Sequence, residues 1–363
     1  MNGRTLITLV MALAAIICPA AVAQQTVYEK KSGPEQNSRV QGGANQTNQV
    51  SMKLDRGGKV TLTNRTGAIV ITGWDRDTVE AKAIDGTELV PIEVSDQSSR
   101  SRIFLSVPYS GFRRSGDVRL DVKLPRYADI ESINSQRADI EVTGIDGAVS
   151  ITSGSGDVRV SSVGSLRINR SQGNLNVNGV KGSFTARTTH GDVLAENVGG
   201  FVDLATTHGN VSVREAGGDL RANSTTGDVQ VRCAKGRADV TSANGSVMLT
   251  GIAGDLDAYT ANGNVIFTGP IRADGRYRLK TLSGDIRMTI QPEPPGFIAT
   301  IESYSGEIET HFPLRLETPL RGGPINRRIV GRYGDGGARI TLDSFSGSVR
   351  IIKGTAASVD QCK

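Results

Sequence analysis

Few residues of this sequence have types and spacings that could do chemistry, and a histidine pair comes first. His190 and His208 stand in nearly identical segments, Thr-Thr-His-Gly-Asp and Thr-Thr-His-Gly-Asn. Imidazole and carboxylate groups are zinc ligands, and Asp192 follows the first histidine closely. The next equivalent position holds Thr226, so no third histidine completes a site. We interpret the pair as surface residues and predict neither a metal site nor a cofactor.

A basic segment near the C-terminus is the second candidate. It runs from Pro313 to Gly337 and has no Asp or Glu between Pro319 and Tyr333. Its arginines are Arg315, Arg321, Arg327, Arg328 and Arg332. The planar guanidinium suits carboxylates and phosphates, which predicts a loop that binds an anionic envelope polysaccharide, a lipid head group or another envelope protein. The alternative is a solvated loop without a partner.

Carboxylates are the third candidate, since paired Asp or Glu side chains act as acid and base in polysaccharide cleavage. Acidic residues recur directly after the turn glycines, as Asp157 and Asp228 do, where the side chain can bond to the turn backbone. Aromatic platforms for sugar rings are scarce, with 8 Phe, 7 Tyr and 1 Trp. We predict that the protein is not an enzyme. A carbohydrate-active enzyme, a polysaccharide lyase or hydrolase, is the alternative.

The charge balance gives no support to nucleic-acid binding. There are 42 Lys and Arg against 37 Asp and Glu, a formal net charge of +5. A dedicated nucleic-acid binder would carry a larger basic excess. The 44 glycines among 363 residues favour a chain of many short strands and turns, provided that the glycines are periodic.

The glycines are periodic, and their repeat is the strongest signal in the sequence. One series advances by 17 or 18 residues, and a second series is offset from it by about nine. The first comprises Gly156, Gly173, Gly191, Gly209, Gly227, Gly245 and Gly263, with later copies at Gly284, Gly306 and Gly347. The second comprises Gly147, Gly164, Gly182, Gly200, Gly218, Gly236, Gly254 and Gly275.

Apolar residues alternate with polar ones after each glycine, as Val229 and Val231 do after Gly227. Period-2 alternation predicts a short strand with one buried face. Stacked copies of such a unit pair each strand with its equivalent one coil later and form a narrow continuous core. The predicted fold is all-β: a single-chain parallel β-solenoid of the β-helix or β-roll type, with about 18 residues per coil in two half-units.

The regular repeat divides the chain into segments. Residues 24–49 are polar and predict a disordered leader. The rest we divide into irregular N-terminal cap coils at 50–130, regular repeats at 131–312, the basic loop at 313–337, a final coil at 338–353 and a tail at 354–363. Cys233 and Cys362 lie 129 positions apart, and we expect them to be unpaired.

The N-terminus carries an export signal. An apolar stretch closes on Ala21-Val22-Ala23, a small-x-small cleavage site that predicts a signal peptide over residues 1–23. No later stretch approaches the roughly 20 apolar residues of a membrane span. We therefore predict an exported protein of the periplasm or the cell surface, with release to the medium as a further alternative.

The coils also carry the marks of a known family. The segment KLPRYADIESI leads into them, and turns reading SGDV, HGDV, TGDV and SGDI recur. This combination resembles the exported bacterial β-strand-repeat family named "putative adhesins", over roughly residues 50–353. The resemblance implies a non-enzymatic, adhesin-like or envelope-scaffold protein of unknown ligand. The sequence departs from the Ser-Gly-Asp turn at Gln136-Arg137-Ala138-Asp139 and carries the basic insertion.

The cleavage site gives a direct test. If the signal peptide is removed after Ala23, N-terminal sequencing of the protein from an extracytoplasmic fraction will begin at Gln24. Recovery of the chain solely from the cytoplasm with Met1 in place would contradict the prediction.

Overall fold

The computed structural model describes residues 45–108, 117–291, 293–317, 327–355 and 362. The chain separates into two units, Met1–Gln41 and Gly42–Lys363, and the first lies wholly outside the described residues. The predicted signal peptide and most of the predicted leader lie there as well. The described residues include no helix with the length and apolar character needed to cross a membrane.

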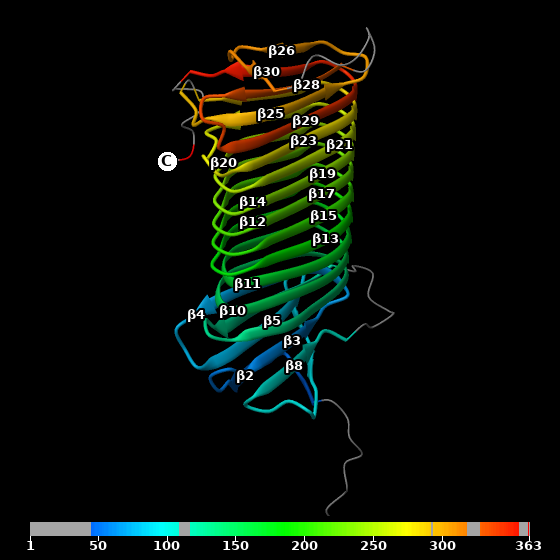
Figure 1. Ribbon diagram of the computed structural model, residues 1–363. Helices are drawn as coiled ribbons and strands as arrows, with labels where there is room; N and C mark the ends of the chain where they lie inside the picture. Colours follow the sequence, from blue (N-terminus) through cyan, green and yellow to red (C-terminus); the bar gives the residue numbers. More distant parts are fainter. Residues whose placement is uncertain (1–44, 109–116, 292, 318–326, 356–361, 363) are drawn as a thin grey trace, which may run out of the picture. The chain divides into compact units, whose positions relative to one another are not determined.

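The body of the second unit is a solenoid of two parallel strand stacks (Figure 1). It begins with the long strands β10 (Asp129–Ser155) and β11 (Val158–Gln172), which turn corners without interruption. One stack continues through β13 (Phe184–His190), β15 (Val202–His208), β17 (Leu220–Thr226), β19 (Ala238–Asn244), β21 (Leu256–Asn262) and β23 (Arg276–Ser283). The other continues through β12 (Leu175–Val180), β14 (Val193–Val198), β16 (Val211–Ala216), β18 (Val229–Ala234), β20 (Val247–Ile252), β22 (Val265–Gly269) and β24 (Ile286–Ile290).

Each strand pairs in parallel with its equivalent in the next layer, in the register of the glycine repeat. Val211 pairs with Val229 and Val229 with Val247, 18 residues later each time. All three side chains are at most 1% exposed, whereas the outward Gln230 between two buried valines is half-buried. The predicted parallel β-solenoid is confirmed.

Corner glycines allow neighbouring layers to come this close. Gly227 has a φ of 141°, a conformation that other residues rarely adopt. A Cβ atom on Gly227 would lie 2.2 Å from the carbonyl oxygen of Gly209 in the preceding layer. The glycine repeat in the sequence therefore reflects a steric requirement for glycine at one corner of the coil.

The N-terminal strands cap the stack, and their order in space differs from their order in the sequence. Strands β3 (Lys59–Thr63) and β4 (Thr66–Trp74) lie between β10 on one side and β8 (Arg102–Ser106) and β9 (Val118–Pro125) on the other. Antiparallel strands close this end: β1 (Asn45–Thr47), β2 (Gln49–Lys53), β5 (Thr78–Asp85), β6 (Glu88–Val90) and β7 (Ile92–Val94). The end of the predicted disordered leader thus forms β1 and begins β2.

The C-terminal end shows the same exchange of order. Strand β29 (Ala338–Ser346) lies between β23 and β25 (Phe297–Ser303), and β30 (Val349–Lys353) lies between β24 and β26 (Ile308–Thr310). In Figure 1 the red strands β29 and β30 lie between yellow and orange ones. The last coil of the sequence therefore lies inside the stack, with β25 and β26 on its outer side.

The segment 313–337 differs from the predicted open loop. Within it β28 (Arg327–Tyr333) pairs antiparallel with β25, and the short β27 (Arg315–Leu316) pairs with β28. The aromatic ring of Tyr333 stacks on Phe297, with ring centroids 5.2 Å apart. Because β25 has an open edge on its outer side, this segment supplies the strand that covers it.

A disulfide corrects the expectation that the cysteines are unpaired. Cys362 is bonded to Cys233 in β18, with the two Cα atoms 5.3 Å apart. Strand β30 stands four pairings further along the stack than β18, so the disulfide joins Cys362 to a layer well before the last one. The separation of 129 residues conceals this proximity in the sequence. Closing such a loop stabilises the folded state by about 4–5 kcal/mol in the chain-entropy model.

The narrow core predicts a sharp contrast between two adjacent residues. Val229→Asp places an unpaired carboxylate in an apolar column and is expected to lower the free energy of unfolding by at least about 4 kcal/mol. Gln230→Asp faces outward and is expected to change it by less than about 1 kcal/mol. Urea unfolding followed by circular dichroism measures both, and equal effects would contradict the assigned register.

Candidate binding surface

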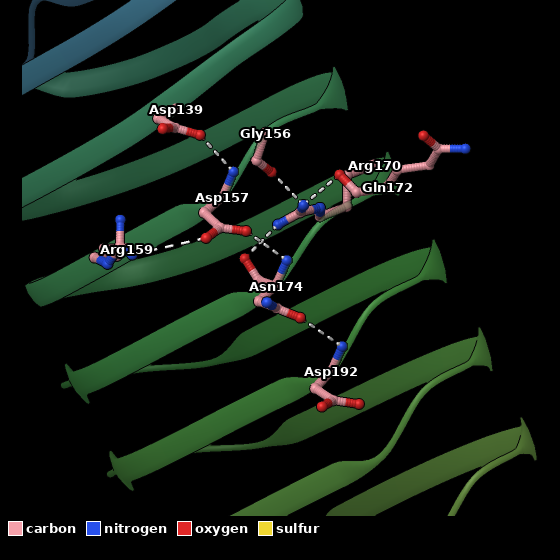
Figure 2. A network of polar contacts seen from close by, with 8 residues as sticks. All are labelled: Asp139, Gly156, Asp157, Arg159, Arg170, Gln172, Asn174 and Asp192. Carbon is pink, nitrogen blue, oxygen red and sulfur yellow. Dashed lines mark hydrogen bonds and ion pairs between the residues drawn. The ribbon is translucent and has the colours of Figure 1, made fainter.

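A ladder of side chains joins the layers at the glycine corner (Figure 2). The Oδ1 atom of Asp157 accepts a hydrogen bond from the Asn174 amide, and Asn174 accepts one from the Asp192 amide. The ladder continues through Asn210, Asp228, Ser246, Asn264, Asp285 and Ser348, with donor–acceptor distances of 2.7–3.4 Å. The sequence predicted bonds within each turn. The structure instead places them between layers, so these groups hold the register of the stack.

A second column, inside the same corner, is formed by buried hydroxyl groups. Ser224 donates to the carbonyl of Gly209 at 2.9 Å, and Ser242 donates to that of Gly227 at 2.9 Å. Thr260, Thr281, Ser344 and Ser303 repeat the contact with the corner glycine of the preceding layer. Each hydroxyl satisfies a carbonyl that the turn would otherwise leave without a partner.

Arg170 takes the place of a hydroxyl in this column (Figure 2). Its guanidinium, in a residue that is 6% exposed, donates to the carbonyls of Gly156, Gln172 and Asn174. Burial lowers the pKa of the Arg170 guanidinium, and the carboxylates of Asp157 and Asp139 act in the opposite direction. The side chain points into the corner and bonds to its backbone. We therefore assign it to the scaffold.

The predicted arginine patch is only partly assembled. Arg328 lies 3.0 Å from the Glu302 carboxylate, and Arg332 contacts Glu317 at 2.6 Å. Arg315 is exposed and stands opposite Arg332 in the β27–β28 pair. Arg321 lies outside the described residues, and only the backbone of Arg327 is described. Two of the predicted ligand-binding charges are thus compensated within the protein.

The histidine pair is where the repeat places it. The rings of His190 and His208 stack with centroids 4.7 Å apart and planes 5° from parallel, and both residues are exposed. Within the described part of the chain, no three His, Cys, Asp or Glu residues are grouped in a way that could hold a metal ion. The two histidines therefore form an exposed stack of imidazole rings.

An exposed apolar ridge, formed by Leu282, Phe345 and Tyr304, was not predicted. The three residues occupy one column across the β23, β29 and β25 layers and are 45%, 56% and 45% exposed. The rings of Tyr304 and Phe345 stack with centroids 4.7 Å apart. Sequence reasoning missed the ridge because two of its members come from layers whose order in space is reversed.

Exposed arginines on the same layers were also missed. Arg276 of β23 and Arg339 of β29 are paired in register and lie side by side. The sequence did contain a signal, since both stand directly before an inward residue of the second half-unit. It was overlooked because 63 residues separate them.

Comparison with known proteins settles the family. The model of the Toastrack DUF4097 family matches residues 22–230 and 200–352, which together cover most of the chain. The protein belongs to the Toastrack DUF4097 family. The resemblance stated from the repeats and turns is thereby confirmed. No curated protein matches this Toastrack chain significantly.

Three crystal structures align with the Toastrack chain at low identity. A putative cell adhesion protein from Clostridium sporogenes ATCC 15579 is 7% identical, covers 84% of this chain and 99% of its own, and has a TM-score of 0.20. A putative adhesin from Bacteroides fragilis NCTC 9343 is 11% identical, with coverages of 86% and 100% and a TM-score of 0.26. A putative lipid binding protein from Parabacteroides distasonis ATCC 8503 is 10% identical, with coverages of 86% and 98% and a TM-score of 0.22.

The corner ladder yields a matched pair of variants. Asp228 accepts a hydrogen bond from the Ser246 amide at 2.7 Å. Asp228→Ala removes this acceptor and is expected to lower the free energy of unfolding by about 1–2 kcal/mol. Asp228→Asn keeps an oxygen there, as at Asn210 and Asn264, and is expected to cost less than about 0.5 kcal/mol. Chemical denaturation compares the two, and an equal loss for both variants would refute the ladder's contribution.

Proposed function

We propose that this protein is a non-enzymatic, exported solenoid that binds another component of the bacterial envelope through its outer surface, as an adhesin-like or scaffold protein. The observation that carries the proposal is that the corner carboxylates bind backbone amides of the neighbouring layers. Each of three corner carboxylates accepts a hydrogen bond from a backbone amide of the next layer; they belong to Asp157, Asp192 and Asp228. These carboxylates, which have the chemistry of an acid or a base, therefore hold adjacent layers in register.

The pairing of outward carboxylates with arginines also favours binding over catalysis. Glycoside cleavage needs two carboxylates that face one bond, one of them as acid and the other as base or nucleophile. Asp239 and Asp257 are partners in adjacent strands, but each of them also pairs with an arginine. Arg221 lies 3.8 Å from Asp239, and Arg278 lies 3.4 Å from Asp257. A solvated surface with mixed charges suits recognition of an extended partner.

The disulfide supports export. Disulfides such as Cys233–Cys362 persist in oxidising compartments and are rare in the cytosol. The proposed location is therefore the periplasm or the cell surface, as the predicted signal peptide requires.

The arginines of the segment 313–337 belong to this proposed surface. Arg315 is exposed and directed to the same face as Arg332. Arg328 and Arg332 are held by carboxylates, which leaves them fewer free donors for a ligand. The segment therefore contributes to the surface without forming a complete site by itself.

A polysaccharide screen separates the proposed function from an enzyme on the same scaffold. The purified mature protein is incubated with neutral and anionic polysaccharides, and new reducing ends and unsaturated products are measured. We expect no turnover, together with retention of the protein on at least one insoluble envelope preparation. Turnover that is abolished by replacing a pair of carboxylates would overturn the proposal.

A further inference from the structure

Four arginines surround one concavity on the outer face of the C-terminal layers. The concavity has a volume of about 440 Å³ and spans the layers of β19, β21, β23 and β29. Asp255 and Asp257 are the two carboxylates that also line it. The arginines are Arg237, Arg276, Arg278 and Arg339. The lining thus carries four positive charges against two negative ones.

The carboxylates of the concavity are already engaged. Asp257 pairs with Arg278 at 3.4 Å. Asp255 accepts a hydrogen bond from the Arg276 amide at 3.1 Å and lies 3.8 Å from the Arg272 guanidinium. The side chains of Arg237, Arg276 and Arg339 form no hydrogen bond or ion pair with any residue that the structure describes, and all three are exposed. Their charge is therefore available to a ligand.

The stacking register places two of these arginines together. Arg276 and Arg339 are direct partners in adjacent parallel strands, which lie about 4.8 Å apart. Like charges directly opposite each other destabilise a sheet unless an anion lies between them. Two guanidinium groups on adjacent strands can both donate to one oxyanion.

The same column extends beyond the concavity. Ile298 of β25 follows Arg339, and the antiparallel register then adds Arg332 of β28 and Arg315 of β27. A ligand lying along the solenoid axis would thus meet the Arg276–Arg339 pair first. Beyond the uncharged Ile298 it would meet Arg332, which Glu317 holds, and the exposed Arg315. This arrangement fits a linear molecule better than a single small ion.

We propose that Arg276 and Arg339, with Arg237 and Arg278 beside them, bind a linear polyanion through its carboxylate or phosphate oxygens. The inference rests on the proposed binding function, for which it names the site and the ligand chemistry. The ligand lies across the layers, and its oxyanions contact Arg276 and Arg339 on adjacent strands.

The test uses two short polyanions and two double variants of the mature protein. Trigalacturonate supplies carboxylates and tripolyphosphate supplies phosphates. Binding is measured by calorimetry at about 0.01 M ionic strength, where charges are weakly screened. Arg276→Gln with Arg339→Gln removes the proposed site. The control, Arg137→Gln with Arg167→Gln, removes the same charge from exposed positions of β10 and β11 that lack ion pairs within the described chain. Arg137 is paired with Thr66, and Arg167 with Ser150 and Thr185, so neither faces a second arginine in these pairings.

We expect the wild type to bind at least one probe, the site variant to raise its Kd at least about tenfold, and the control to change it less than about twofold. Preference for trigalacturonate assigns the site to a polycarboxylate, and preference for tripolyphosphate assigns it to a phosphate polymer. Circular dichroism verifies that both variants keep the strand signal.

Three results would overturn the inference. They are binding that the site variant leaves unchanged, an equal loss in the site and control variants, and absence of binding of both probes to the wild type up to about 1 mM. Each result would show that these arginines are not a polyanion site. The proposed binding function would remain, with a partner of different chemistry. Polysaccharide turnover would instead overturn the proposed function and leave the measured polyanion affinity intact.

Discussion

Each layer of this solenoid has backbone donors and acceptors along its edges that only an adjacent layer can satisfy. A parallel neighbour satisfies them in a fixed register, and that register forces equivalent residues into columns. The valine column at Val229, the hydroxyl column at Ser224 and the ladder at Asp228 all follow from it. Glycine is required where the layers are closest at a corner, as at Gly227.

The outer surface inherits the same constraint. A charge at one outward position faces whatever the next coil carries at that position, a few ångströms away. Where the sequence alternates, as at Arg221 and Asp239, the column neutralises itself. Where it repeats a charge, as at Arg276 and Arg339, the column concentrates it. A partner that recognises such a surface therefore contacts residues of several successive layers, and not those of a single coil.

The sequence was sufficient to predict the solenoid, its period and its inward columns, because these are local patterns that recur. It was insufficient for the ends, where Gly306 and Gly347 signal coils without indicating which of them adjoins Gly284. The disulfide between Cys233 and Cys362 depends on the same missing information. The predicted arginine segment failed as a complete site because Glu302 and Glu317, which pair with Arg328 and Arg332, become neighbours only through strand pairing.

The exchange of layers at the C-terminus bears on how the chain acquires its structure during synthesis. A simple solenoid can grow one coil at a time in the order of translation, but here β29 and β30 complete a layer that is enclosed by strands made earlier. The segment from β23 to β30 must therefore assemble as a cooperative group. Cys362 comes nine residues after Lys353, the end of β30, and reaches Cys233 from there. The disulfide therefore ties the last part of the chain covalently to a layer that is translated long before it.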